Sequence, residues 1–182
     1  THYFSPSVRF GKQAAAVFSR WVAARTDCLI APTGKVRMLL QRYGVRCPVF
    51  VVPSGIDLAP FSREADPWRS AVLRASLDIP ADRTILAFVG RLAEEKNVDE
   101  LLRCRAALGD VPVTLLIVGD GPDRPRLEQT AAALSLAAPD VVFAGMVPPE
   151  QVADWYQLGD LFVSASTSET QGLTYFEALA AG

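Results

Sequence analysis

Two carboxylates, Glu169 and Glu177, stand eight residues apart near the end of the 182-residue sequence. Glu169 lies in a polar loop after an apolar run, and Glu177 lies inside the helix that the following residues predict. Ionised carboxylates accept hydrogen bonds from neighbouring hydroxyls such as those of a sugar. Gly172 and Leu173, which open that helix, can present main-chain amides to a phosphate. Taken alone, the two acids fit a loop and an exposed helix face at least as well as a binding site.

Two cations form a second group of candidates. Arg91 and Lys96 share one loop, which follows Gly90 and the apolar run ILAFV. From such a loop both can converge on one anion, and a diphosphate leaving group gains charge as its bond to a sugar breaks. The pair therefore predicts that a diphosphate is stabilised here without a metal ion. The alternative is a pair of solvated surface cations.

Three glycine turns follow apolar runs or open a helix, at Gly90, at Gly119–Gly121 and at Gln171–Leu173. In open α/β sheets ligands bind at the carboxyl ends of the strands, and a glycine there lets the backbone approach a phosphate. None of the turns has the spacing of a P-loop or of a dinucleotide-binding fingerprint, since Gly121 runs directly into Pro122. Each turn is by itself a weak signal.

The elements that must position these residues are strands and helices in alternation. Most of the apolar runs are continuous, which indicates strands buried on both faces of a parallel sheet. The order predicts an α/β fold with doubly wound, Rossmann-like parallel sheets. Strands are expected at Cys28–Pro32, Val49–Pro53, Ile85–Gly90, Val113–Gly119, Val141–Ala144 and Leu161–Ala165, and helices at about 8–26, 34–43, 67–77, 97–108, 123–137, 149–158 and 173–181.

The charge balance changes sign along the chain. Residues 1–48 hold eight basic residues and one acidic residue, a balance of +7, while 49–182 hold ten basic and nineteen acidic residues, a balance of −9. The prolines and glycine of PSGIDLAP mark a linker at the changeover. We therefore expect one domain remnant at 1–57 and most of a second domain at 58–182, with the basic part facing something anionic.

The helix expected at about 8–26 separates an apolar face from a basic one. One interpretation is a core helix whose basic face is solvated. The other is a helix on a membrane surface, with aromatic residues inserted and basic residues against anionic headgroups. The apolar face holds Phe10, Ala14, Val17, Phe18, Trp21 and Val22, and the basic face holds Arg9, Lys12 and Arg20.

Composition is that of an ordinary globular protein, with 50% hydrophobic and 21% charged residues. No run approaches the ~20 apolar residues of a membrane-spanning helix, and the basic, amphipathic opening stretch is not expected to be a signal peptide. Because the chain lacks a starting Met and stops within a pattern, we expect a fragment. Cys28, Cys47 and Cys104 show no disulfide or zinc spacing and are expected to be reduced, buried thiols of a cytoplasmic protein.

Four ordered motifs carry a family resemblance: FVGRLAEEKN, VGDGPDRPRLE, VFAGMV and SASTSETQGLTYFEALAAG. Together with the linker PSGIDLAPF, they resemble the donor-binding domain of retaining family 4 glycosyltransferases, which have the GT-B fold. The resemblance covers essentially all of 28–182. It departs from the family pattern at Ser54, where Asn is common, and at Gln171, where many members have Phe, so the sugar preference stays open.

The resemblance assigns roles to individual residues. Arg91 and Lys96 would bind the donor diphosphate near Gly90, and Glu169 would hold the sugar hydroxyls. Glu177 would hold the ribose. Main-chain groups of Gly172 and Leu173 would meet phosphate or sugar, and those around Met146 and Val147 would read the base.

The opening THYF, the basic helix and CLIAPTGKVRMLLQRYGV are similar to members that glycosylate diacylglycerol or related lipids. His2, the only histidine, is expected to be structural or incidental, with an acceptor-side role as the alternative. The resemblance implies transfer of a hexose from a nucleoside diphosphate sugar, expected to be a UDP-sugar, without a metal or other cofactor.

The resemblance also suggests an acceptor and a location, and it leaves two alternative functions open. The acceptor hydroxyl would belong to a membrane glycerolipid, with an anionic membrane surface and no nucleic acid as partner, and the enzyme would lie at the inner face of the membrane. One alternative is a GT-B sugar-nucleotide epimerase. The other is a non-catalytic nucleotide-sugar-binding fragment, since this chain alone is expected to be inactive.

Overall fold

The computed structural model describes the backbone of residues 6–182 and the side chains of residues 11–182. The chain forms two compact units, the first ending at Ile56 and the second beginning at Asp57. The boundary expected from charge and linker composition lies one residue later. That the first unit belongs to an acceptor-binding domain stays a prediction.

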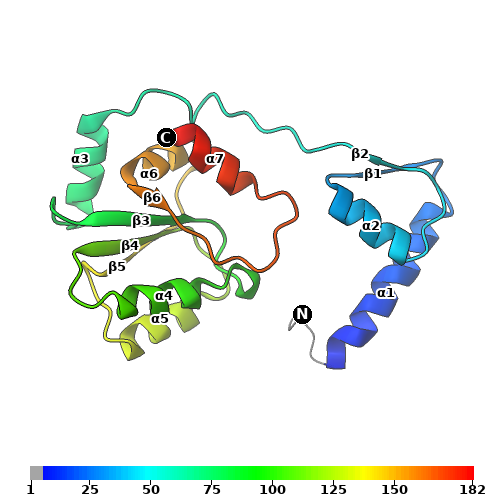
Figure 1. Cartoon of the computed structure of the whole chain (residues 1–182), viewed down its shortest axis with the longest axis horizontal. Helices are drawn as coiled ribbons and strands as arrows, with labels where there is room; N and C mark the ends of the chain where they lie inside the picture. Colours follow the sequence, from blue (N-terminus) through cyan, green and yellow to red (C-terminus); the bar gives the residue numbers. More distant parts are fainter. Residues whose placement is uncertain (1–5) are drawn as a thin grey trace. The chain divides into compact units, whose positions relative to one another are not determined.

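The first unit is a two-stranded parallel sheet with two helices (Figure 1). Strand β1 pairs with β2 so that Leu29 lies opposite Val49. The side chain of Thr33 caps α2 by accepting a hydrogen bond from the amide of Val36 at 3.3 Å. Its elements are α1 (Pro6–Ala23), β1 (Leu29–Ala31), α2 (Gly34–Arg42) and β2 (Val49–Val51).

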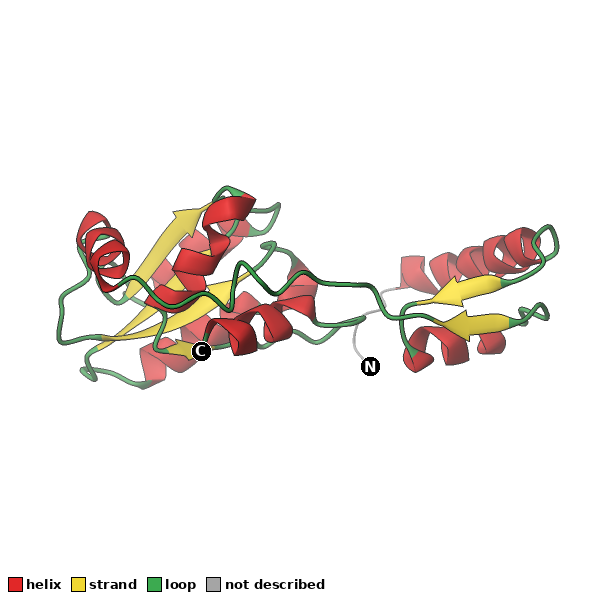
Figure 2. Ribbon diagram, turned by 90° about the horizontal axis from the view of Figure 1, so that it is seen from above, coloured by secondary structure: helices red, strands yellow, loops and turns green. Residues whose placement is uncertain are grey.

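The second unit is built on a four-stranded parallel sheet in the order β5-β4-β3-β6 (Figure 2). The central strand β4 is buried along its whole length, as its unbroken run VTLLIV predicts for a strand covered on both faces. The strands are β3 (Thr84–Val89), β4 (Val113–Val118), β5 (Val141–Gly145) and β6 (Leu161–Phe162).

Helices cover both faces of this sheet, so the second unit has two hydrophobic cores. On one face Leu102 and Leu127 pack against Leu115 and Ile117. On the other face Trp155 and Leu158 pack with Leu116. The first face carries α4 (Val98–Ala107) and α5 (Arg124–Ala133), and the second carries α3 (Pro67–Ser76), α6 (Val152–Leu158) and α7 (Leu173–Ala181), with short 3-10 turns η1 (Glu94–Lys96) and η2 (Pro149–Gln151) before α4 and α6.

An ion cluster around the buried side chain of Arg105 lies at the amino ends of the strands. Arg105, only 3% exposed, contacts Asp140 and also donates to the main-chain oxygens of Val113 and Gly109. Arg83 contacts the same carboxylate from the start of β3. The cluster links the start of β3, helix α4 and the turn before β5, so we expect it to stabilise the fold.

The predicted α/β fold is confirmed, although several elements are shorter than expected or shifted, and two of them differ most. The helix expected at 123–137 ends at Ala133, because Ser135 has a positive φ of 57° and Pro139 follows. The strand expected at Leu161–Ala165 is reduced to Leu161–Phe162. The amide of Val163 still donates to the oxygen of Ala87, so the chain keeps its direction toward the carboxyl edge.

The prediction that the cysteines are buried is wrong. All three are free thiols, but Cys28 and Cys104 are exposed and Cys47 is partly exposed. The buried positions of α4 are Val98, Leu102 and Arg105, which recur at helical spacing. Cys104 falls off that stripe, so its position on the helix outweighs its apolar character.

Candidate functional site

The loops after β3 and β4 meet through their backbones at the carboxyl edge of the sheet. The amide of Leu92 donates to the oxygen of Asp120 at 2.9 Å. A Cβ on Gly119 would lie 2.0 Å from the carbonyl oxygen of Gly90, and Gly119 has a φ of +128°. Only glycine allows this approach. The glycine turns expected from the sequence thus fix the path of the loop that carries Arg91 and Lys96.

The loop after β6 is hydrogen-bonded to η1, which follows β3. The amide of Thr167 donates to the main-chain oxygen of Glu95 at 3.0 Å, and the hydroxyl of Ser166 donates to the same oxygen at 3.2 Å. These bonds place two segments, about 70 residues apart in sequence, against each other. Lys96 and Glu169 lie on these two segments.

Lys96 and Glu169 form an ion pair, with 2.6 Å between Nζ and Oε1. Their side chains are 20% and 26% exposed, so the pair is shielded but still open to solvent. Partial burial would raise the pKa of Glu169, but hydrogen bonds from Lys96 and Ser166 outweigh it and hold that pKa below its ordinary value. The sequence predicted both residues as site residues, and the structure brings them together.

Arg91 lies on the same loop but has a different partner. Its guanidinium is 2.9 Å from the carboxylate of Glu95, one helical turn away, and its side chain is 66% exposed. This hydrogen bond lowers the pKa of Glu95. Convergence of Arg91 with Lys96 on a single anion stays a prediction, because in this structure each cation faces its own carboxylate.

Helix α7 begins directly after this loop, at Leu173. Gly172 precedes it with a φ of +67°, and a Cβ there would lie 2.8 Å from the ring of Tyr175. A larger residue would have an unfavourable positive φ, and its Cβ would also clash with the ring of Tyr175. Helix α7 thus begins four residues after Glu169, and its first main-chain amides provide a local positive potential there.

Glu177 lies one turn further along α7 and accepts a hydrogen bond from the hydroxyl of Tyr156 on α6, at 2.8 Å. Tyr156 is only 6% exposed. Its burial, then its hydrogen bond to Glu177 and the charge there, raise the pKa of this phenol well above its ordinary value. Sequence reasoning missed Tyr156, since an aromatic residue within an apolar helix pattern gives no signal beyond core packing.

The remaining predicted residues follow β5. Met146 is 80% exposed, and Val147 is partly buried against the core on the α6 face. Their reading of a base stays a prediction. His2 lies outside the described residues, as do the side chains of Arg9 and Phe10.

The described part of the chain holds neither a cluster of metal ligands nor a membrane-spanning helix. Within it no three His, Cys, Asp or Glu side chains gather as a metal site would require. No helix in that part is long and apolar enough to cross a membrane.

Comparison with known proteins assigns the chain to a family. Residues 70–182 match the family model described as glycosyl transferases group 1. The chain belongs to this family. This finding agrees with the resemblance carried by the loop motifs.

Two relatives match along the whole chain. An alpha-monoglucosyldiacylglycerol synthase from Streptococcus pneumoniae is 36% identical, and one from Acholeplasma laidlawii is 33% identical. Each alignment covers 100% of this chain but only 42% and 47% of the respective relative. The chain thus spans less than half the length of these proteins.

Solved structures support the predicted GT-B-type fold. HepE of Anabaena in complex with UDP-glucose superposes with a TM-score of 0.80 over 93% of this chain and 47% of its own, at 22% identity. Sucrose-phosphate synthase from Thermosynechococcus elongatus gives 0.76 over 93% of this chain and 42% of its own, at 26% identity.

Proposed function

We propose that the whole protein is a retaining hexosyltransferase of family 4 that uses a nucleoside diphosphate sugar, specifically a UDP-sugar. The observation that carries this proposal is the Lys96–Glu169 ion pair at the carboxyl edge of the sheet. A cation for a diphosphate and a carboxylate for sugar hydroxyls lie in contact there, beside the first residues of α7. Such a pair fits a ligand in which sugar and diphosphate are joined by one bond.

The chemistry follows from charge. As the bond between sugar and diphosphate breaks, negative charge grows on the leaving oxygen. Lys96, Arg91 and the first amides of α7 supply positive potential, so we propose that no metal ion is required. Glu169 and Glu177 would orient the hexose and the ribose, which reduces the cost of aligning donor and acceptor.

Glucose is the proposed sugar and a glycerolipid the proposed acceptor. Support comes from the two relatives named as alpha-monoglucosyldiacylglycerol synthases and from the UDP-glucose complex of HepE. Each of these names describes the other protein, so donor and acceptor of this chain need direct measurement.

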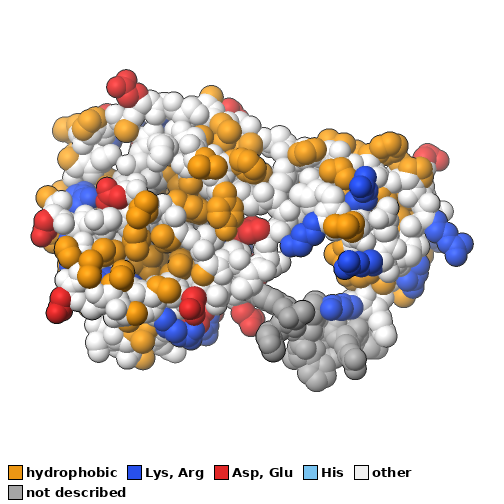
Figure 3. All heavy atoms as spheres, in the orientation of Figure 1, with side chains coloured by type: hydrophobic (Ala, Val, Ile, Leu, Met, Phe, Trp, Pro, Cys, Tyr) orange, Lys and Arg blue, Asp and Glu red, His pale blue; other side chains and the backbone are white. Residues whose placement is uncertain are grey.

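The first unit supports a lipid acceptor. On α1, the side chains of Val17, Phe18 and Trp21 are 57%, 64% and 54% exposed. Together with Gln13 and Ala14 they line an open depression along this one helix. Lys and Arg side chains gather on the face of this unit that Figure 3 draws. Exposed aromatic residues beside cations are typical of a helix at an anionic membrane surface, so we propose peripheral attachment at the inner face.

The donor assay uses the full-length protein with UDP-, GDP- and ADP-sugars and a lipid extract. We expect a glycolipid formed from UDP-glucose, with the α configuration kept and activity unchanged in EDTA. Loss of activity in EDTA that Mg²⁺ or Mn²⁺ restores would overturn the metal-free mechanism. Conversion of the UDP-sugar to its epimer, with no transfer, would instead indicate an epimerase.

The membrane assay compares co-sedimentation with anionic and neutral vesicles. The double variant Val17→Ser/Phe18→Ser should lose most binding to anionic vesicles, and salt should weaken the wild type. Trp68→Ser is the matched control, because Trp68 is a 72% exposed aromatic residue on α3 of the second unit. Equal binding of the wild type to both kinds of vesicle would remove the membrane from the proposal and leave the transferase.

A further inference from the structure

Glu177 is held at one of its two carboxylate oxygens. Its Oε2 accepts the 2.8 Å hydrogen bond from the hydroxyl of Tyr156. A carboxylate that grips a ribose needs an oxygen directed at the hydroxyls, and a long flexible side chain loses rotamer freedom when it adopts one orientation. A donor that fixes the second oxygen removes this cost before the ligand arrives.

Tyr156 is itself held by aromatic contacts on two sides. The ring of Phe61 meets it edge-on with 5.8 Å between centroids, and the ring of Phe162 lies tilted at 5.8 Å. Both arrangements are favourable for aromatic pairs. Because the buried phenol has a raised pKa, it stays protonated and can only donate to the carboxylate at neutral pH.

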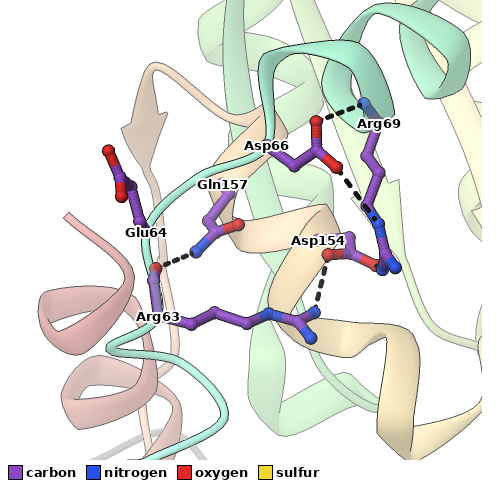
Figure 4. Close-up of a pocket in the computed structure, with 6 residues that line it drawn as sticks. All are labelled: Arg63, Glu64, Asp66, Arg69, Asp154 and Gln157. Carbon is purple, nitrogen blue, oxygen red and sulfur yellow. Dashed lines mark hydrogen bonds and ion pairs between the residues drawn. The ribbon is translucent and has the colours of Figure 1, made fainter.

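The short helix that carries Tyr156 is clamped as well. Around a cavity of about 210 Å³, the guanidinium of Arg63 lies 2.6 Å from Asp154, and Gln157 donates to the main-chain oxygen of Arg63 at 2.8 Å (Figure 4). Arg69 reaches the same carboxylate at 3.4 Å. These contacts hold α6 between the chain preceding α3 and the sheet.

We infer that Tyr156 is a positioning residue that orients Glu177 for the ribose hydroxyls of a nucleoside diphosphate. The inference rests on the proposed function, in which Glu177 holds the ribose. Tyr156 reaches the ligand only through Glu177. It should therefore affect discrimination between ligands with and without ribose hydroxyls, while leaving the rest of the binding free energy unchanged.

The test is calorimetry on the full-length protein with UDP and with 2′,3′-dideoxy-UDP. We expect the wild type to prefer UDP by about tenfold, the effect of one charge-assisted hydrogen bond. Glu177→Gln should largely remove this preference. Tyr156→Phe should reduce it several-fold with the dideoxy affinity unchanged, and Phe61→Leu should reduce it less, because the hydroxyl remains.

Tyr175→Phe is the matched control. This change removes the hydroxyl of another tyrosine, which donates to the hydroxyl of Ser164 at 3.0 Å, and it should leave the preference for UDP intact.

If Glu177→Gln loses the preference and Tyr156→Phe keeps it, the inference fails while the proposed function stands. If Tyr156→Phe weakens both ligands equally, Tyr156 is structural and the inference fails. If the wild type has no preference, or Glu177→Gln keeps it, the ribose role of Glu177 fails first and the inference with it.

Discussion

The two ends of the sheet in the second unit both hold cations against carboxylates, but in different ways. At the amino ends the side chain of Arg105 is 3% exposed and also donates to main-chain oxygens, while its partner Asp140 keeps 36% of its side chain exposed. At the carboxyl ends both partners are partly exposed, Lys96 by 20% and Glu169 by 26%. The cation at the amino edge is thus enclosed by the protein, whereas solvent reaches both the cation and the carboxylate at the carboxyl edge.

The difference shows that an ion pair alone does not indicate a site. Removing the carboxylate of Asp140 leaves the buried guanidinium of Arg105 without its counter-charge, which costs stability. Opening the partly exposed Lys96–Glu169 pair costs less, since water and the ligand compensate. We therefore expect stability effects from the amino edge and activity effects from the carboxyl edge.

The largest effect is expected from Asp140→Ala. This change leaves Arg105 buried without its carboxylate and should lower the free energy of unfolding by about 3 kcal/mol. Urea unfolding of the full-length protein measures it. Asp110→Ala, which changes an exposed acid, should stay within about 0.5 kcal/mol of the wild type. A loss in Asp140→Ala no larger than in this control would remove the contrast between the two edges.

Lys96→Ala should have the next largest effect, on activity and not on folding. Loss of one preorganised cation at the leaving group should lower kcat/KM roughly a hundredfold, which corresponds to about 3 kcal/mol of lost transition-state stabilisation. Arg103→Ala is the control, because Arg103 pairs with Asp99 on α4 and should leave turnover unchanged. Similar kinetics in both variants would show that Lys96 is only a surface cation.

Glu169→Gln tests whether this carboxylate acts on the sugar and not on the nucleotide. The carboxylate partly neutralises Lys96, so its removal should leave UDP binding equal or tighter. Turnover of the UDP-sugar should fall by about tenfold, because the hexose loses a charge-assisted bond. Calorimetry and steady-state kinetics separate the two quantities. A loss of UDP affinity as large as that of Glu177→Gln would contradict the separate roles of the two carboxylates.

The smallest effect concerns pH. The folded protein holds the pKa of Glu169 below its ordinary value near 4.5, so the pair stabilises the fold above that value. The contribution is lost as pH falls through the lower folded pKa. The stability difference between wild type and Glu169→Gln should be under about 1 kcal/mol, constant from about pH 7 to 5 and absent at strong acidity. A difference that grows on acidification would reverse the sign of this linkage.

Sequence alone predicted the layers and the edge of the site. Unbroken apolar runs such as VTLLIV indicated buried strands, and their alternation with helices placed Lys96 and Glu169 at one edge. That these two residues touch depends on bonds from Thr167 and Ser166 to Glu95. No sequence spacing encodes such long-range contacts.

Residue type alone was misleading for three other side chains. Arg105 is buried and Cys104 exposed, the reverse of what their chemistry suggests, because helix position decides which side chain faces the sheet. Tyr156 gave no functional signal, since its role depends on the oxygen it meets on another helix.

The close approach of Gly119 to Gly90 has a consequence for redesign. The two loops are joined by main-chain atoms, so their path does not depend on the side chains that project from them. Outward residues other than Arg91 and Lys96 can therefore be exchanged in a library without moving the backbone of these loops, provided that both glycines are kept. A search for new donor preferences should vary the outward positions of these loops and hold their backbone partners constant.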